Sequence, residues 1–257
     1  MPAYYADTVG HFREAPLETL ELTLMRAYES DRYKDLITAQ ISSWRNQIQA
    51  LKAAFSSADL ASFNTDNWGI AIEFVVPRKM GRIDTVLLIG NAIVVLEFKS
   101  DSVDSGAADQ VEDYCLDLLY FHSPSHQHVI YPVVVANTGT DSPTRRSQAF
   151  GELQLTTFVD TTRLGNWLLP VAAKHFSELQ LPVKQWNAGD YRPVPTIVEA
   201  AIGMFAEMQV EDIAKAGCDP INLTATISTI RNIVTEAAKK TRKQYALLLG
   251  CLGRVRP

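Results

Sequence analysis

Residues 81–99 read GRIDTVLLIGNAIVVLEFK, and this stretch predicts the hairpin around which the fold is organised. Two apolar runs rich in β-branched residues, 83–89 and 92–98, flank the dipeptide Gly90-Asn91. Glycine and asparagine tolerate the positive φ angles that tight hairpin turns require. The two runs are therefore expected to be neighbouring antiparallel strands.

Acidic residues occur where the two strands of this hairpin should meet at its open end. Asp84 lies near the start of the first strand, and Glu97 lies near the end of the second. The start of one antiparallel strand lies beside the end of the other, so we expect these carboxylates to converge. Glu97 and Lys99 are two residues apart and should project from the same face. Such charges are costly at the end of an apolar hairpin unless they are paired or bind a metal.

The two carboxylates offer the oxygen ligands that a hard cation such as Mg²⁺ prefers. A bound metal of this kind can activate a water and stabilise the charge that builds on a phosphate. Lys99 would then contact the same water or a phosphate oxygen as a point charge. The alternative interpretation is that Glu97 and Lys99 are ordinary charges at a strand end, with Asp84 a solvated neighbour.

The segment 107–122, AADQVEDYCLDLLYFH, predicts an amphipathic helix after the hairpin. One side of this helix carries residues at helical spacing, namely Ala107, Gln110, Tyr114, Leu118 and Phe121. Gln110 and Tyr114 are four residues apart and share a face. A helix at this point in the chain would lay that face on the sheet beside the carboxylates.

Three blocks follow one another along the chain: Gly81-Arg-Ile-Asp84, Glu97-Phe-Lys99 and Gln110-Val-Glu-Asp-Tyr114. Together they resemble the PD-(D/E)XK nuclease superfamily. Within it they match the RecB-type branch, whose signature is G-x-x-D, then E-x-K, then Q-x-x-x-Y. The resemblance implies metal-dependent hydrolysis of phosphodiester bonds, with DNA favoured as substrate. It implies that Asp84 and Glu97 hold Mg²⁺ or Mn²⁺ and that Lys99 positions the water or stabilises the transition state. Gln110 and Tyr114 would contact the site or the nucleic-acid backbone.

One departure from the family pattern keeps other functions open. Many relatives add an acidic residue or a histidine from a helix before the first strand, and the helix predicted at 39–55 has neither. Glu73, on a strand predicted at 70–77, could take this catalytic role or could be a solvent-facing strand residue. The alternative functions are a catalytically inactive nuclease fold that binds nucleic acid or docks a partner, and a protein-interaction module.

The predicted element order is helix 39–55, three strands, helix 107–122 and a buried strand within 128–137. The last strand follows a helical crossover, so it should run parallel to a strand of the preceding meander. The fold class is therefore α/β, with a mixed sheet flanked by helices. This α-β-β-β-α-β order is also the restriction-endonuclease-like core that the resemblance implies. An N-terminal helical element is predicted over 16–38, and 154–161 is a candidate further strand.

Three regions are predicted along the chain. Residues 1–160 would form the nuclease-like domain, 161–243 a helical region or linker, and 244–257 the start of a P-loop ATPase or helicase domain. The second region contains apolar segments separated by proline and glycine signals, which is typical of helices. It shows no catalytic constellation.

The C-terminal sequence predicts a truncated P-loop. The apolar run 245–249 followed by Gly250 resembles the first strand of a P-loop ATPase, but 251–257, CLGRVRP, is not a Walker loop. Codons for 251–257 can be chosen so that reading one base earlier gives VPGAGKT, which completes a Walker pattern after Gly250. We therefore expect the N-terminal part of a bacterial nuclease–helicase fusion, cut short, with no ATP cofactor in this chain. A role in phage defence or DNA repair would suit such a fusion.

Composition limits the class of protein. The chain has 257 residues, of which 47% are hydrophobic and 21% charged, as in soluble globular proteins. The absence of a long apolar run and of a signal-peptide pattern predicts a cytoplasmic protein with no membrane partner. Cys115, Cys218 and Cys251 are far apart and predict neither a zinc site nor a disulfide. They are also too few for the four-cysteine iron–sulfur cluster of some relatives.

Charge bears on the expected nucleic-acid partner. The net charge of −5 argues mildly against a broad non-specific nucleic-acid surface. Arg78, Lys79 and Arg82 nevertheless form a basic patch next to Asp84, and we expect this patch to contact phosphate. A homodimer is a further expectation, because many relatives dimerise to cut both strands.

Overall fold

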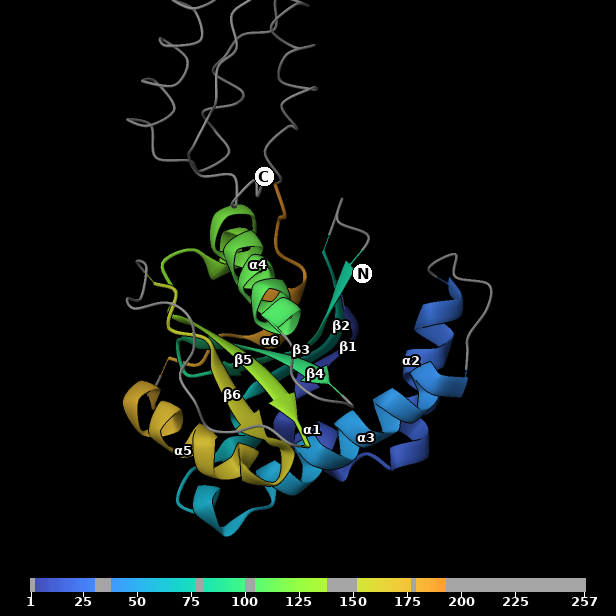
Figure 1. The fold of residues 1–257 in the computed structure, drawn as a ribbon. Helices are drawn as coiled ribbons and strands as arrows, with labels where there is room; N and C mark the ends of the chain where they lie inside the picture. The colour runs from blue at the N-terminus through green and yellow to red at the C-terminus, as the bar shows by residue number, and fades with distance from the viewer. Residues whose placement is uncertain are drawn as a thin grey trace, which may run out of the picture. The chain divides into compact units, whose positions relative to one another are not determined.

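A computed structural model of the chain describes residues 3–30, 38–76, 81–99, 105–137, 152–176 and 179–192. Within these ranges the chain forms an α/β unit on one six-stranded sheet, with helices against both faces (Figure 1). Several predictions fall outside the described residues. They concern Arg78, Lys79, the helices expected beyond residue 192 and the P-loop start at 244–257.

The sheet is mixed, as the sequence predicts. Its strands are β1 (Ala3–Thr8), β2 (Gly69–Val76), β3 (Gly81–Ile89), β4 (Ala92–Lys99), β5 (Ile130–Ala136) and β6 (Thr157–Asp160), and they lie in this order across the sheet. The first four are antiparallel neighbours, whereas β5 and β6 continue the sheet in the same direction as β4. The parallel pairing of β5 with a strand of the meander is confirmed.

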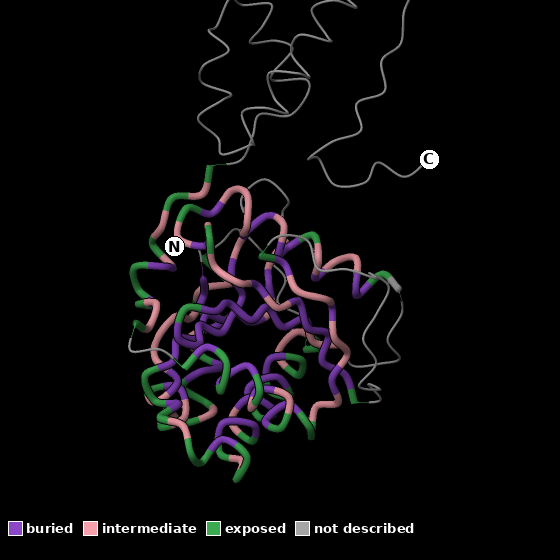
Figure 2. The backbone as a smooth tube through the Cα atoms, turned by 90° about the vertical axis from the view of Figure 1, so that its left-hand side faces the viewer, coloured by how far each residue is buried: buried purple, intermediate pink, exposed green. Residues whose placement is uncertain are grey.

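Helices cover both faces of the sheet. They are α1 (Val9–Glu14), α2 (Leu17–Ser30), α3 (Thr38–Phe55), α4 (Ser105–Phe121), α5 (Leu164–His175) and α6 (Val183–Asn187). One apolar cluster joins a face of the sheet to α1, α2, α3 and α5, and a second joins the opposite face to α4 and α6. Burial follows the strands and the inward faces of these helices (Figure 2). The predicted order of helix, three strands, helix and strand is found in α3, β2–β4, α4 and β5.

The central hairpin is confirmed. β3 and β4 pair up to Ile89 and Ala92, and Gly90-Asn91 forms the two-residue connection. Gly90 has a φ of 57°, whereas the φ of Asn91 is not positive. A positive φ at the first turn residue alone is typical of the type II′ turn, where glycine is favoured.

The N-terminal strand β1 was not predicted from the sequence. It pairs antiparallel with β2, with Tyr5 opposite Ile72, and it forms one edge of the sheet. The chain passes directly from this strand into α1, where the Thr8 hydroxyl accepts a hydrogen bond from the backbone N–H of His11 at 3.3 Å. No local turn signals this strand, because its partner lies far away along the chain.

The first compact unit extends from Met1 to Tyr191 and runs past the boundary predicted at residue 160. It includes α5, whose Leu164 and Leu168 are fully buried beneath the sheet, and α6, whose Trp186 is buried on the opposite face. Among the described residues, none of the helices combines the length and the apolar character that crossing a membrane requires.

Candidate active site

The site lies at a fork between two strands. Pairing of β3 with β4 runs from the hairpin turn to Thr85 and Leu96, where it ends. Beyond this point the start of β3 pairs with β2, and the end of β4 pairs with β5. Asp84 is the first residue of β3 past the last pair, and Glu97 is the first of β4. The fork therefore holds both carboxylates that the sequence predicted to converge.

A side-chain contact bridges the fork. The Oδ2 atom of Asp84 accepts a hydrogen bond from the backbone N–H of Phe98 at 2.7 Å. This contact fixes the Asp84 carboxylate beside the end of β4, next to Glu97. Burial raises the pKa of Asp84 well above its usual range, and the negative charges of Glu97 and Glu73 raise it further.

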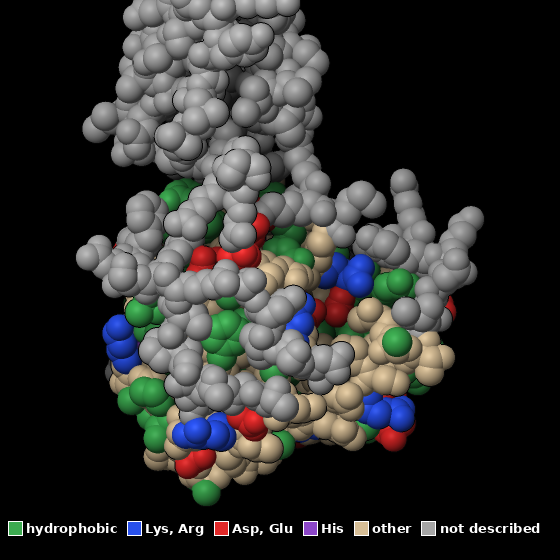
Figure 3. All heavy atoms as spheres, viewed as in Figure 1, with side chains coloured by type: hydrophobic (Ala, Val, Ile, Leu, Met, Phe, Trp, Pro, Cys, Tyr) green, Lys and Arg blue, Asp and Glu red, His purple; other side chains and the backbone are tan. Residues whose placement is uncertain are grey.

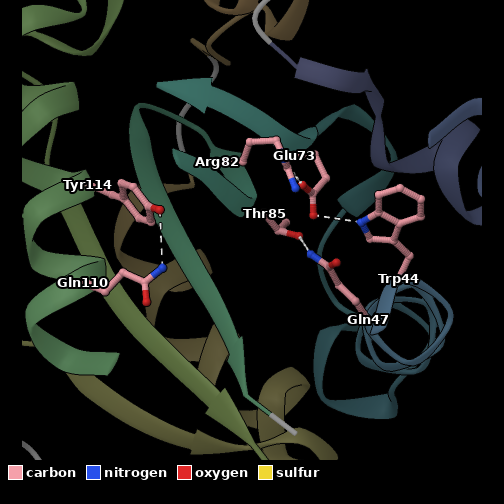
Figure 4. Close-up of polar contacts among 7 residues, drawn as sticks. All are labelled: Trp44, Gln47, Glu73, Arg82, Thr85, Gln110 and Tyr114. Carbon is pink, nitrogen blue, oxygen red and sulfur yellow. Dashed lines mark hydrogen bonds and ion pairs between the residues drawn. The ribbon is translucent and has the colours of Figure 1, made fainter. Parts of the chain in front are cut away.

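Glu97 begins a chain of polar contacts that reaches α4. Glu97 is buried, and its Oε1 atom accepts from the Lys99 ammonium at 2.9 Å. Lys99 also donates to the Gln110 carbonyl oxygen at 3.1 Å. The Gln110 amide lies 3.3 Å from the Tyr114 hydroxyl (Figure 4). The structure thus brings together Asp84 and all four residues of the predicted E-x-K and Q-x-x-x-Y blocks.

Burial also governs the protonation of Glu97 and Tyr114. The pKa of Glu97 is raised by its removal from water, and the neighbouring Lys99 ammonium opposes this rise. The pKa of Tyr114 is raised by burial and by the nearby charges of Glu97 and Asp84. The site therefore places negative charge in a partly desolvated position, which favours uptake of a proton or a cation.

Packing explains why residue 81 is a glycine. A Cβ added at Gly81 would lie 2.8 Å from the Tyr114 hydroxyl oxygen. The side chain of Tyr114 is buried on the α4 face, so it has little room to withdraw. Gly81 therefore allows the tyrosine to pack over the start of β3.

Glu73 is buried, with 3% of its surface exposed, so the solvent-facing alternative is wrong. Its Oε1 atom accepts from the Trp44 indole N–H at 2.8 Å, and its Oε2 atom is ion-paired with Arg82 (Figure 4). The guanidinium carbon of Arg82 lies 5.4 Å from the ring centroid of Tyr4 and 5.3 Å from that of Tyr28. Arg82, predicted to contact phosphate, is thus held inside the fold by Glu73 and two aromatic rings.

The backbone of β2 changes face at Glu73. Ile72 packs in the cluster on the α3 side, whereas Phe74, two residues later, packs in the cluster on the α4 side. Residues two apart on a regular strand share a face. Glu73 lies between them with a φ of 54°, a left-handed conformation that costs about 1–3 kcal/mol in a non-glycine residue. The strained residue therefore redirects the strand.

The neighbouring strand β3 changes face at the matching position. Ile83 packs on the α4 side, whereas the Thr85 hydroxyl accepts from the Gln47 amide of α3 at 2.6 Å. Pairs on either side place Glu73 directly opposite Asp84. Both strands thus depart from regular alternation at the pair of acidic residues, on the β2 side of the fork.

The carboxylates of the fork offer oxygen ligands to a divalent cation. Among the described residues, no group of three His, Cys, Asp or Glu side chains is placed to hold a metal. Asp84 and Glu97 supply two carboxylates, and the Oε2 atom of Glu97 is buried without a hydrogen-bond partner. Mg²⁺ commonly takes one or two carboxylates and completes its shell with waters and substrate phosphates. The two residues therefore fit such an ion.

Three histidines, His122, His126 and His128, follow α4, and they are not among any group of three placed to hold a metal in the described part of the chain. His122 is buried, and its Nδ1 atom lies 2.7 Å from the Ser125 hydroxyl. Its ring packs against Phe74 and Trp186, and burial lowers its pKa to about 4. His128 instead contacts the backbone carbonyl of Asn91 at 2.9 Å.

Surface charge is dispersed on the face that Figure 3 shows. There the acidic and basic side chains of the described residues occur in small, separate groups. The described residues therefore show no broad patch of one charge on this face.

Three neighbours of the site were missed as site residues. An apolar position at helical spacing, such as Trp44, predicts only a core residue, and no sequence pattern indicates that its indole N–H binds the buried Glu73 carboxylate. Tyr4 and Tyr28 flank Arg82 because its side chain reaches past β2 toward β1, which α2 contacts. No local pattern relates them to residue 82.

Comparisons of the chain with protein-family profiles, with curated proteins and with solved structures found no match.

Proposed function

We propose that this chain is a Mg²⁺- or Mn²⁺-dependent nuclease that hydrolyses phosphodiester bonds, with DNA the favoured substrate. The observation that carries the proposal is the grouping of Asp84, Glu97 and Lys99 at one strand fork. A buried oxygen of Glu97 there lacks a hydrogen-bond partner. The PD-(D/E)XK resemblance of the three sequence blocks leads to the same activity.

The residues of the fork divide the chemistry between them. Asp84 and Glu97 would hold the cation, which when bound supplies an activated water and neutralises charge on the phosphate. Lys99, within hydrogen-bonding distance of Glu97 and Gln110, would place its ammonium beside the attacked phosphate. Gln110 would orient Lys99 through this contact, and Tyr114 would orient Gln110.

A catalytically inactive fold that binds nucleic acid or a partner is the second candidate. It is favoured by one observation, that Glu73 is already bound to Trp44 and Arg82. Only two carboxylates at the fork then remain for a metal. In this case nucleic-acid binding would survive the loss of the Asp84 charge.

The direct test is cleavage of labelled single- and double-stranded DNA and RNA in Mn²⁺ or Mg²⁺. Asp84→Asn is the informative variant, because asparagine can still accept the Phe98 N–H while losing the charge. Asp113→Asn is a matched control, since Asp113 is an exposed acidic residue on α4. We expect cleavage by wild type and Asp113→Asn, and none by Asp84→Asn or in EDTA. Equal cleavage by Asp84→Asn, or none by folded wild type, would contradict the proposal.

A further inference from the structure

A buried polar cluster of Trp44, Glu73 and Arg82 lies on the α3 side of the fork. Both oxygens of the Glu73 carboxylate are engaged, Oε1 by the Trp44 indole at 2.8 Å and Oε2 by the Arg82 guanidinium. Gln110, which binds Lys99, lies on the α4 side of the strands (Figure 4). The Glu73 carboxylate is therefore turned toward α3 and already satisfied.

The same cluster holds the start of β3. Between Gly81 and Asp84 this strand pairs only with β2, because its pairing with β4 ends at Thr85. Arg82 lies two residues before Asp84, and its ion pair with Glu73 joins β3 to β2 by side chains as well as backbone. Trp44 extends this connection to α3, since its indole donates to the same carboxylate.

The strained backbone of Glu73 also indicates that this residue holds the start of β3 in place. Glu73 stands opposite Asp84, and both strands change face at this pair. A left-handed glutamate persists only when its surroundings hold it in place. The contacts to Trp44 and Arg82 stabilise this conformation of Glu73. Because Glu73 stands opposite Asp84, they also orient the Asp84 side chain.

We propose that Glu73 is a positioning residue that aims Asp84 across the fork through Trp44 and Arg82, and that it is not a metal ligand. The inference rests on the proposed function for its metal site, which would then take one divalent cation at Asp84 and Glu97. It assigns the third acidic residue to the geometry of the site.

The first readout needs no metal. Hydrogen exchange of the Phe98 amide reports the bond to Asp84, and we expect Trp44→Phe and Glu73→Gln each to speed it about tenfold. Gln49→Ala is the control, because Gln49 is an exposed residue on the same helix. Arg82→Gln should give the same increase, and it replaces Trp44→Phe if that variant does not fold. Unchanged exchange in these variants would overturn the proposal.

The second readout is Mn²⁺ binding followed by electron paramagnetic resonance. We expect one ion per wild-type chain and an affinity about tenfold weaker in Trp44→Phe and in Glu73→Gln. The double variant should bind Mn²⁺ no more weakly than either single variant, because both substitutions act through the Trp44–Glu73 contact. A second ion lost only in Glu73→Gln would make Glu73 a ligand and overturn the proposal. Absence of binding to wild type would contradict the proposed function, while the exchange readout would still decide the role of Glu73.

Discussion

Asp84 and Phe98 are joined by a hydrogen bond of 2.7 Å, from the backbone N–H of Phe98 to the Asp84 carboxylate. The bond crosses the two strands just past the last residue pair between them. A carboxylate thus takes the place of a backbone acceptor, and it brings a negative charge close to buried Glu97. Stability and proposed activity both depend on this arrangement.

Asp84→Asn should stabilise the metal-free protein at neutral pH, on the order of 1 kcal/mol. The change keeps an acceptor for Phe98 and removes a charge whose burial is unfavourable. The pKa of Asp84 is raised in the folded state, so the folded chain binds more protons than the unfolded chain above the usual carboxyl range. Stability is therefore lost as pH rises through the folded pKa.

Urea unfolding at a series of pH values in EDTA checks this sign. The free energy of unfolding should fall less with rising pH in Asp84→Asn than in wild type. His122, whose pKa burial lowers to about 4, contributes equally to both proteins and cancels in the comparison. Parallel curves for the two proteins would show that Asp84 is not perturbed.

Divalent metal should offset the cost of holding the Asp84 and Glu97 carboxylates close together in a partly desolvated site. Mn²⁺ at about 100 times its dissociation constant should stabilise wild type by about 2.7 kcal/mol, seen as a rise in Tm. At one fixed Mn²⁺ concentration, the rise in Tm should be larger at higher pH, because the carboxylates must lose their protons to bind metal. Glu97→Gln should show no rise, and Asp113→Asn should match wild type. A similar rise in Glu97→Gln would place the ion elsewhere.

Gly81→Ala should destabilise the protein by about 1–3 kcal/mol, because the new methyl group meets the Tyr114 hydroxyl. Adding Tyr114→Phe removes the clashing oxygen and should restore most of the loss. A double-mutant cycle of urea unfolding measures this coupling. Additive effects of the two changes would mean that Gly81 is required for another reason.

Lys99→Met should destabilise the protein more at high pH than at low pH. Lys99 opposes the rise in the pKa of Glu97, so its removal leaves a buried carboxylate unpaired when ionised. Loss of one partner of a buried pair costs about 3–5 kcal/mol, and this pair, with Lys99 partly exposed, should show the lower end or less. Lys99→Arg keeps the charge and serves as control. Equal losses at both pH values would argue against the pairing.

The sequence predicted those parts of the fold that depend on local pattern. The hairpin followed from two apolar runs and Gly90-Asn91, and strand alternation correctly placed Glu97 and Lys99 side by side. The helical spacing of Gln110 and Tyr114 likewise predicted the face that meets the site. These features depend on spacing within a short segment, which the sequence shows directly.

Other parts depend on contacts between distant segments. β1 forms because it pairs with β2, with Tyr5 opposite Ile72, and no local sequence pattern predicts this pairing. Glu73 adopts a positive φ that glutamate rarely favours, so its change of strand face has no sequence signal. Arg82 was expected to contact phosphate because it is a cation close to Asp84 in the sequence. The sequence does not show that Tyr4 and Glu73 instead surround its guanidinium group.

Cleavage of labelled DNA in Mn²⁺ by wild type and Asp84→Asn, side by side, tests the central claim most directly. We predict cleavage by wild type that EDTA abolishes, and none by Asp84→Asn although that variant is folded and at least as stable. Cleavage that persists in Asp84→Asn, or its absence in folded wild type with either ion and all four substrates, would contradict the assignment of this fork as a nuclease site.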